Sequence, residues 1–214
     1  VLERTSIAER LSPGLVEALC PGVDGRALLD EIERQQLFLV RLDDAGTWFR
    51  YHALFREGLR HLLTRSGPDA VTELHQRAVA WLQDAGLVEE AVPHAIAAGD
   101  PDAAARLIRS LSATMVGRGE QATLEGWIDA LPREALARHP GLGADLGAIR
   151  LIKGDVEGCE ALTMELDRRL ADDPSPEASW ARGRALGIAA AAAGSRLGWE
   201  LALERGARAI ALLP

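Results

Sequence analysis

Cysteine, lysine and long apolar runs are scarce in this sequence of 214 residues. Its two cysteines, Cys20 and Cys159, are far apart and match no metal-ligand spacing. This argues against a disulfide framework and a zinc site and makes a reducing cytoplasm the expected compartment. The alanine-rich stretch 189–193 is too short and too weakly apolar to span a membrane. No charged-then-apolar leader is recognised either, so we expect no membrane association.

Basic residues are too few for a typical nucleic-acid-binding surface. The formal net charge is −8. Up to Ser66 the chain has ten acidic and nine basic residues, and after it 22 acidic and 15 basic residues. Phosphate contacts need clustered Lys and Arg, so we expect no direct binding of nucleic acid by this chain.

Helix signals dominate the first part of the chain. Ser12 and Pro13 are typical of an N-cap and first helical position, and Asp24 is a second predicted N-cap. The segments LFLVRL (37–42) and TWFRY (47–51) are predicted strands that turn at DDAG. A further helix is predicted after them by an apolar stripe at helical spacing, formed by Leu54, Phe55, Leu59, Leu62 and Leu63.

Short helices, a hairpin and a further helix follow one another in the order of a winged-helix module. The module is expected to span residues 1–66. Its usual role is DNA binding, but no helix in it carries a basic cluster backed by base-reading Asn or Gln.

From residue 67 to 214 the pattern is helix, tight turn, helix. GDPDAAARLIRSL (99–111) and GDVEGCEALTMEL (154–166) share Gly, Asp, an acidic residue, a small residue and two leucines at the same offsets. Helical hairpins with small residues at their crossings bury their apolar faces by stacking. The predicted fold is therefore mainly α, with a winged-helix module and one β-hairpin followed by a TPR-like helical arm.

Three stretches resemble the MalT-type, LuxR-family ATP-dependent transcriptional regulators of the STAND ATPase family. The most specific are RYHALF (50–55), AVAWLQDAGLVEEAVPHAIAAGD (78–100) and WIDALP (127–132). The resemblance implies a relay in which a P-loop ATPase domain precedes a winged helix, helical repeats sense an inducer, and a helix-turn-helix binds DNA. This chain would be the middle of such a bacterial regulator.

The chain departs from that family pattern in a way that fits a middle segment. It contains no GxxxxGK[ST] motif, since its single lysine is Lys153 in LIKGD. It also does not begin with Met, and we expect it to be a piece of a longer protein. We therefore expect no enzyme activity from the chain alone and no cofactor bound by it, with ATP or ADP bound by the longer protein.

His52 is the candidate site residue. In related switches, a methionine-histidine-aspartate motif begins the last winged-helix helix, and its histidine contacts the β-phosphate of ADP. Here Tyr51 replaces the methionine and Ala53 the aspartate. The resemblance implies that His52 contacts a nucleotide phosphate, which suits a helix N-terminus. A second interpretation stays open, in which His52 caps its helix or fills the joint between hairpin and helix.

The remaining candidates carry no predicted chemistry. His75 and His94 are too far apart in sequence for a local metal motif and are interpreted as packing or capping residues. No GxSxG nucleophile context occurs, and we assign no catalytic or metal residue.

Two hypotheses about function follow. In the first, the chain is a signal relay that couples the nucleotide state of an N-terminal nucleotide-binding domain to inducer sensing on the repeats and DNA binding elsewhere, with self-association of the active parent. In the second, the repeats are a protein-interaction scaffold that binds a peptide or another regulatory protein in a concave groove, and the winged helix serves only as a cap without any nucleotide role.

Overall fold

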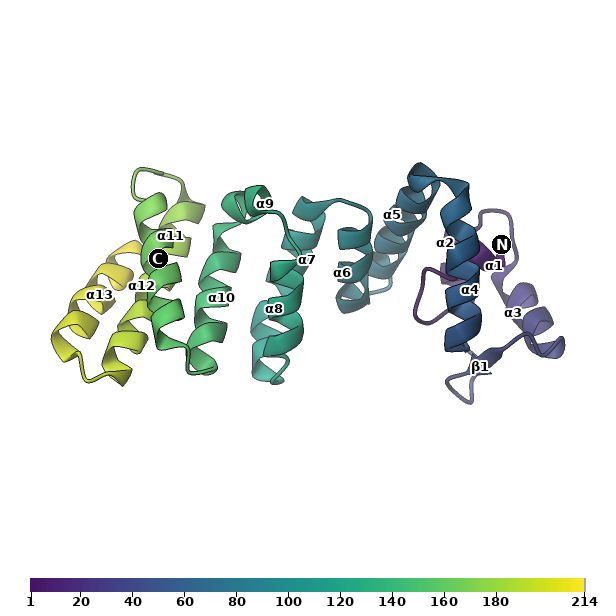
Figure 1. Ribbon diagram of the computed structural model, residues 1–214, viewed down its shortest axis with the longest axis horizontal. Coiled ribbons are helices and arrows are strands. Elements are labelled where there is room, and N and C mark those ends of the chain that lie inside the picture. The colour runs from purple at the N-terminus through teal and green to yellow at the C-terminus, as the bar shows by residue number, and fades with distance from the viewer. Residues whose placement is uncertain (214) are drawn as a thin grey trace. The chain divides into compact units, whose positions relative to one another are not determined.

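The protein is mainly helical, and the computed structural model describes residues 1–213. Its contacts form two compact units, Val1–Asp100 and Pro101–Pro214, which are described separately (Figure 1). The predicted fold class, a winged-helix module with one hairpin followed by helical hairpins, is confirmed. The predicted domain boundary between residues 66 and 67 stays a prediction.

The first unit contains short helices, the hairpin and a longer helical hairpin. Its elements are α1 (Leu2–Thr5), α2 (Pro13–Leu19), α3 (Gly25–Arg34), β1 (Leu39–Arg41), β2 (Phe49–Tyr51), α4 (Ala53–Leu63), the 3₁₀ turn η1 (Thr64–Ser66), α5 (Pro68–Asp84) and α6 (Val88–Ala97). Both predicted N-caps are confirmed. The Ser12 hydroxyl accepts from the Leu15 N–H at 3.3 Å, and the Asp24 carboxylate accepts from the Ala27 N–H at 2.8 Å.

The strands are shorter than their sequence pattern predicts. β1 and β2 pair antiparallel over three residues each, with Val40 opposite Arg50. Gln36 and Phe38 have φ values of 55° and 54°, in the left-handed region, so the chain is not extended before Leu39. The turn is held by Asp43, whose carboxylate accepts from the Thr47 N–H at 2.7 Å.

The core of the first unit lies where α2, α3 and β2 meet. Its largest fully buried side chains include Leu11, Leu15, Leu19, Leu29 and Phe49. Of the predicted apolar stripe on α4, Leu59 and Leu63 are buried, but Leu54 is 74% exposed and Leu62 39% exposed. The helix that the stripe predicts is present, and it packs on the core along only part of its apolar face.

The second unit consists of seven helices within the described residues. They are α7 (Pro101–Gly117), α8 (Gln121–Asp129), α9 (Arg133–Arg138), α10 (Pro140–Ile152), α11 (Val156–Arg169), α12 (Pro176–Ser195) and α13 (Trp199–Leu212). In Figure 1, α10, α11, α12 and α13 follow one another along this unit, and α12 packs against the other three. No helix in residues 1–213 combines the length and apolarity needed to cross a membrane.

Small residues allow the helices of the second unit to approach closely. Ala144, Ala178, Ala181 and Ala185 form a buried cluster with Leu166 and Leu170. Acidic residues are also buried there and are paired. Asp145 accepts from Arg184 at 2.7 Å, and Asp167 accepts from Arg182 at 2.9 Å. Each pair joins two helices, and its charges are compensated inside the unit.

Candidate functional site

His52 lies at the joint between β2 and α4, as predicted, and it is exposed. Its backbone is held on both sides. The His52 N–H donates to the Phe38 carbonyl at 2.7 Å, and the His52 carbonyl accepts from the Arg56 N–H at 2.9 Å. The backbone position is that of an N-cap residue, fixed by strand pairing on one side and by the first turn of α4 on the other.

The imidazole of His52 is not used to cap the helix. Its side chain forms no capping hydrogen bond with α4, and its nearest ring neighbour is Phe38, with centroids 6.5 Å apart. The structure thus places an exposed histidine at the N-terminus of α4. Such a position favours an anionic group, because the helix N-terminus carries partial positive charge and an imidazole can donate to an oxyanion.

A buried histidine pair lies elsewhere in the first unit. His75 on α5 and His94 on α6 have their Nδ1 atoms 2.8 Å apart and ring centroids 5.0 Å apart. One ring must donate and the other accept, so at least one Nδ1 carries a proton and the pair is satisfied when both rings are neutral. The interpretation of both residues as packing residues agrees with their burial.

The environment of this pair disfavours positive charge. Burial, the charge of His75 and that of Arg60 lower the pKa of His94 to about 4. Burial and Arg60 also lower the pKa of His75. Both rings are therefore neutral at physiological pH. Sequence reasoning missed the pairing. The pairing could have been predicted from the short turn between α5 and α6, because the two helices of such a hairpin place residues 19 positions apart side by side.

The other reactive residue types are placed where they have no evident chemistry. Cys20 and Cys159 are both free and buried, and burial raises the pKa of each thiol. Across residues 1–213, no group of three or more His, Cys, Asp or Glu side chains is arranged to hold a metal ion.

Comparison with known proteins assigns the first part of the chain. Residues 1–71 match the family model described as the MalT winged helix domain. This range contains α1 to α4, the hairpin and His52. The first part is therefore similar to the MalT winged helix domain, and the resemblance that its sequence shows to MalT-type proteins is supported at that coarse level.

Curated relatives extend the similarity beyond that domain. The chain is 41% identical over 127 residues to proteins named serine/threonine-protein kinase PknK from two strains of Mycobacterium tuberculosis and from Mycobacterium bovis. The match covers 59% of this chain and 11% of each relative. Because the chain spans only about a tenth of their length, it is similar to one segment of these much longer proteins.

Proposed function

We propose that this chain is a signal-relay segment of a longer STAND-type regulator. In this proposal the winged-helix domain closes on a nucleotide-binding domain of the same protein in its ADP state. The helical repeats transmit inducer binding to that contact, and ATP or ADP is held by the nucleotide-binding domain. Such coupling requires two states in which the contacts differ, and a contact made by His52 only in the ADP state would supply that difference.

The observation that carries the proposal is the free imidazole of His52. It is exposed, it lies at the N-terminus of α4, and its side chain forms no capping hydrogen bond. A histidine that only capped the helix would accept from a first-turn N–H, as Ser12 and Asp24 do on their helices. The match of residues 1–71 to the MalT winged helix domain supports the same role.

We do not restrict the proposed output of the relay to DNA binding. The relatives are named as serine/threonine-protein kinases, whereas the sequence resemblance is to transcriptional regulators. A winged-helix and helical-repeat segment can control either kind of output domain, because function depends on the sites attached to a fold. We therefore propose a cytoplasmic regulatory segment that is not itself an enzyme.

ADP release tests the proposal in the longer protein that carries this chain. His52→Ala is expected to speed ADP dissociation by about tenfold, the effect of losing one hydrogen bond to a charged group. His61→Ala is the matched control, because His61 is another exposed histidine, near the far end of α4. Equal ADP release from both variants and the unmodified protein would remove His52 from the relay.

A protein-interaction scaffold is the second candidate. It is favoured by apolar side chains on α13, where Trp199 is 63%, Leu203 74% and Ile210 76% exposed. Exposed apolar patches on helical repeats mark interaction surfaces. The parent reading frame separates the two candidates, since a P-loop upstream of this segment is required by the relay and is not required by a scaffold.

A further inference from the structure

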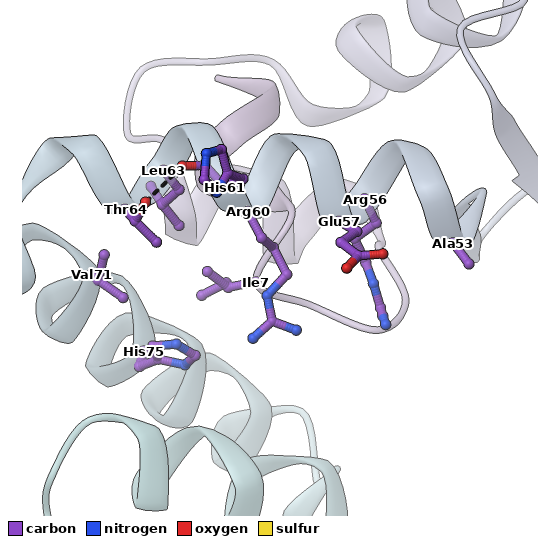
Figure 2. Close-up of a pocket in the computed structure, with 10 residues that line it drawn as sticks. All are labelled: Ile7, Ala53, Arg56, Glu57, Arg60, His61, Leu63, Thr64, Val71 and His75. Carbon is purple, nitrogen blue, oxygen red and sulfur yellow. Dashed lines mark hydrogen bonds between the residues drawn. The ribbon is translucent and has the colours of Figure 1, made fainter.

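A groove of about 570 Å³ lies between α4 and α5 in the first unit, and its lining runs along α4 from Ala53, next to His52, to Leu63 (Figure 2). Its size falls in the range of small-molecule sites. Apolar side chains cover part of its wall, and Figure 2 shows Ile7, Leu63 and Val71 on three different segments around it. The rest of its lining is polar or charged.

Two arginines four residues apart on α4, Arg56 and Arg60, line this groove. Like charges at this spacing repel each other. Arg56 is compensated by an ion pair with Glu9. Among the described residues, no side chain forms a hydrogen bond or ion pair with the guanidinium of Arg60. Figure 2 shows the Arg60 side chain directed from α4 toward α5, on the side where His75 lies.

Arg60 is an exposed residue, and its charge acts on Glu9 as well as on the histidine pair. Its charge acts on His75 and His94 and lowers the pKa of both, so it lies close enough to disfavour their protonation. The groove also contains Glu57, whose carboxylate would repel an anion placed close to it. The Arg60 end of the groove, beside His75, is therefore where a negative group would be bound.

We infer that this groove binds a small amphipathic oxyanion. Its carboxylate or phosphate monoester head pairs with the guanidinium of Arg60, and its short apolar body packs against Ile7, Leu63 and Val71. Guanidinium matches both head groups because its N–H donors form two parallel hydrogen bonds with paired oxygens. The inference is independent of the nucleotide role of His52, since it uses different residues and a ligand that this unit binds by itself.

Hexyl phosphate and hexanoate are suitable probes, because each carries one oxyanion head on a short apolar chain. NMR titration of the 214-residue chain is expected to shift the His75 ring signals and to give a saturable dissociation constant for at least one probe. The tighter of the two identifies the head group as a phosphate monoester or a carboxylate. The uncharged analogue 1-hexanol is expected to bind at least about tenfold more weakly, because it cannot form the charge-assisted hydrogen bonds.

Two variants separate a specific site from general attraction. Arg60→Gln is expected to weaken the better probe by at least about tenfold, as one charge-assisted pair is lost. Arg65→Gln is the matched control, since Arg65 is exposed, lies five residues further along and does not line the groove. Binding that is equal in both variants, equally tight binding of 1-hexanol, or no shift of the His75 signals at millimolar probe would each overturn the inference.

Discussion

The histidines of this protein differ in exposure and in hydrogen bonding, because their surroundings in the fold differ. His52 is exposed at a helix N-terminus, whereas His75 and His94 are buried and bonded to each other. The sequence around His52 predicts its location correctly, because a strand and a helix meet there in the local pattern. The pairing of the other two depends on packing between helices, which a local pattern does not specify.

The buried pair predicts a pH-dependent stability. The pKa of His94 is about 4 in the folded protein, below its ordinary value of 6.5. The unfolded chain therefore binds more protons between these values, so stability is fully present above pH 6.5 and falls as the pH drops toward 4. Urea unfolding is expected to show a loss on the order of 2 kcal/mol between pH 7 and pH 5 from His94 alone.

Substitution of His94 isolates that effect. In His94→Asn the amide can still bond to His75 but cannot titrate, so the loss of stability between pH 7 and pH 5 is expected to be smaller than in the unmodified chain. His61→Asn is the control, because His61 is exposed, and it is expected to keep the full pH dependence. A variant of His94 with unchanged pH dependence would show that other groups cause it.

Helix starts were predictable at the scale of single elements, whereas strand ends and helix faces were not. The predicted caps at Ser12 and Asp24 are both formed, and Asp155 and Ser175 cap their helices in the same way, because each cap depends on a side chain and an N–H three residues later. The first strand is shortened by Phe38, which has positive φ, and Leu54 is exposed on α4. Both depend on tertiary contacts that no sequence pattern contains.

The start of α3 lies so close to α2 that only glycine fits there. A Cβ added to Gly25 would lie 2.1 Å from the Pro13 carbonyl oxygen, which is backbone and cannot rotate away. Gly25→Ala is expected to lower the free energy of unfolding by about 2 kcal/mol or more, since one of the two helices must shift. Chemical denaturation of the chain measures this change.

Gly58 in α4 offers the matched control for that substitution. A Cβ there meets no heavy atom within 4 Å, and the residue is in the interior of an exposed helix face. Gly58→Ala is expected to raise stability by up to about 1 kcal/mol, because alanine has the better helix propensity. If Gly25→Ala were tolerated as well as Gly58→Ala, the close approach of α2 and α3 would be wrong.

At the scale of the whole molecule, the order of elements predicted the fold class, but the extent of each compact unit needed the structure. The first unit continues past the winged helix to Asp100. Arg10 explains part of this extension. Its guanidinium lies 3.9 Å from the centroid of the Trp48 ring and forms an ion pair with Glu90 on α6, 80 residues away in sequence. Contacts between residues so far apart in sequence cannot be predicted from a local sequence pattern.

Most of the candidate site could be named from the sequence, whereas the chemistry proposed for it depends on a nucleotide-binding domain outside this chain. The pattern around residue 52 predicts the strand, the helix and the histidine between them. In the proposed relay, the group that the His52 imidazole contacts is held by that other domain, so no pattern within this chain specifies the ligand. The groove beside Arg60 had no sequence signal beyond two arginines four residues apart on one helix.

The comparison of ADP with AMP binding to the longer protein tests the relay most directly. AMP lacks the β-phosphate that His52 is proposed to contact, so only ADP can form this contact. His52→Ala is expected to weaken ADP binding by about tenfold, as one hydrogen bond to a charged group is lost, and to leave the affinity for AMP unchanged. Equal changes in both affinities, or a change in neither, would contradict the proposed phosphate contact.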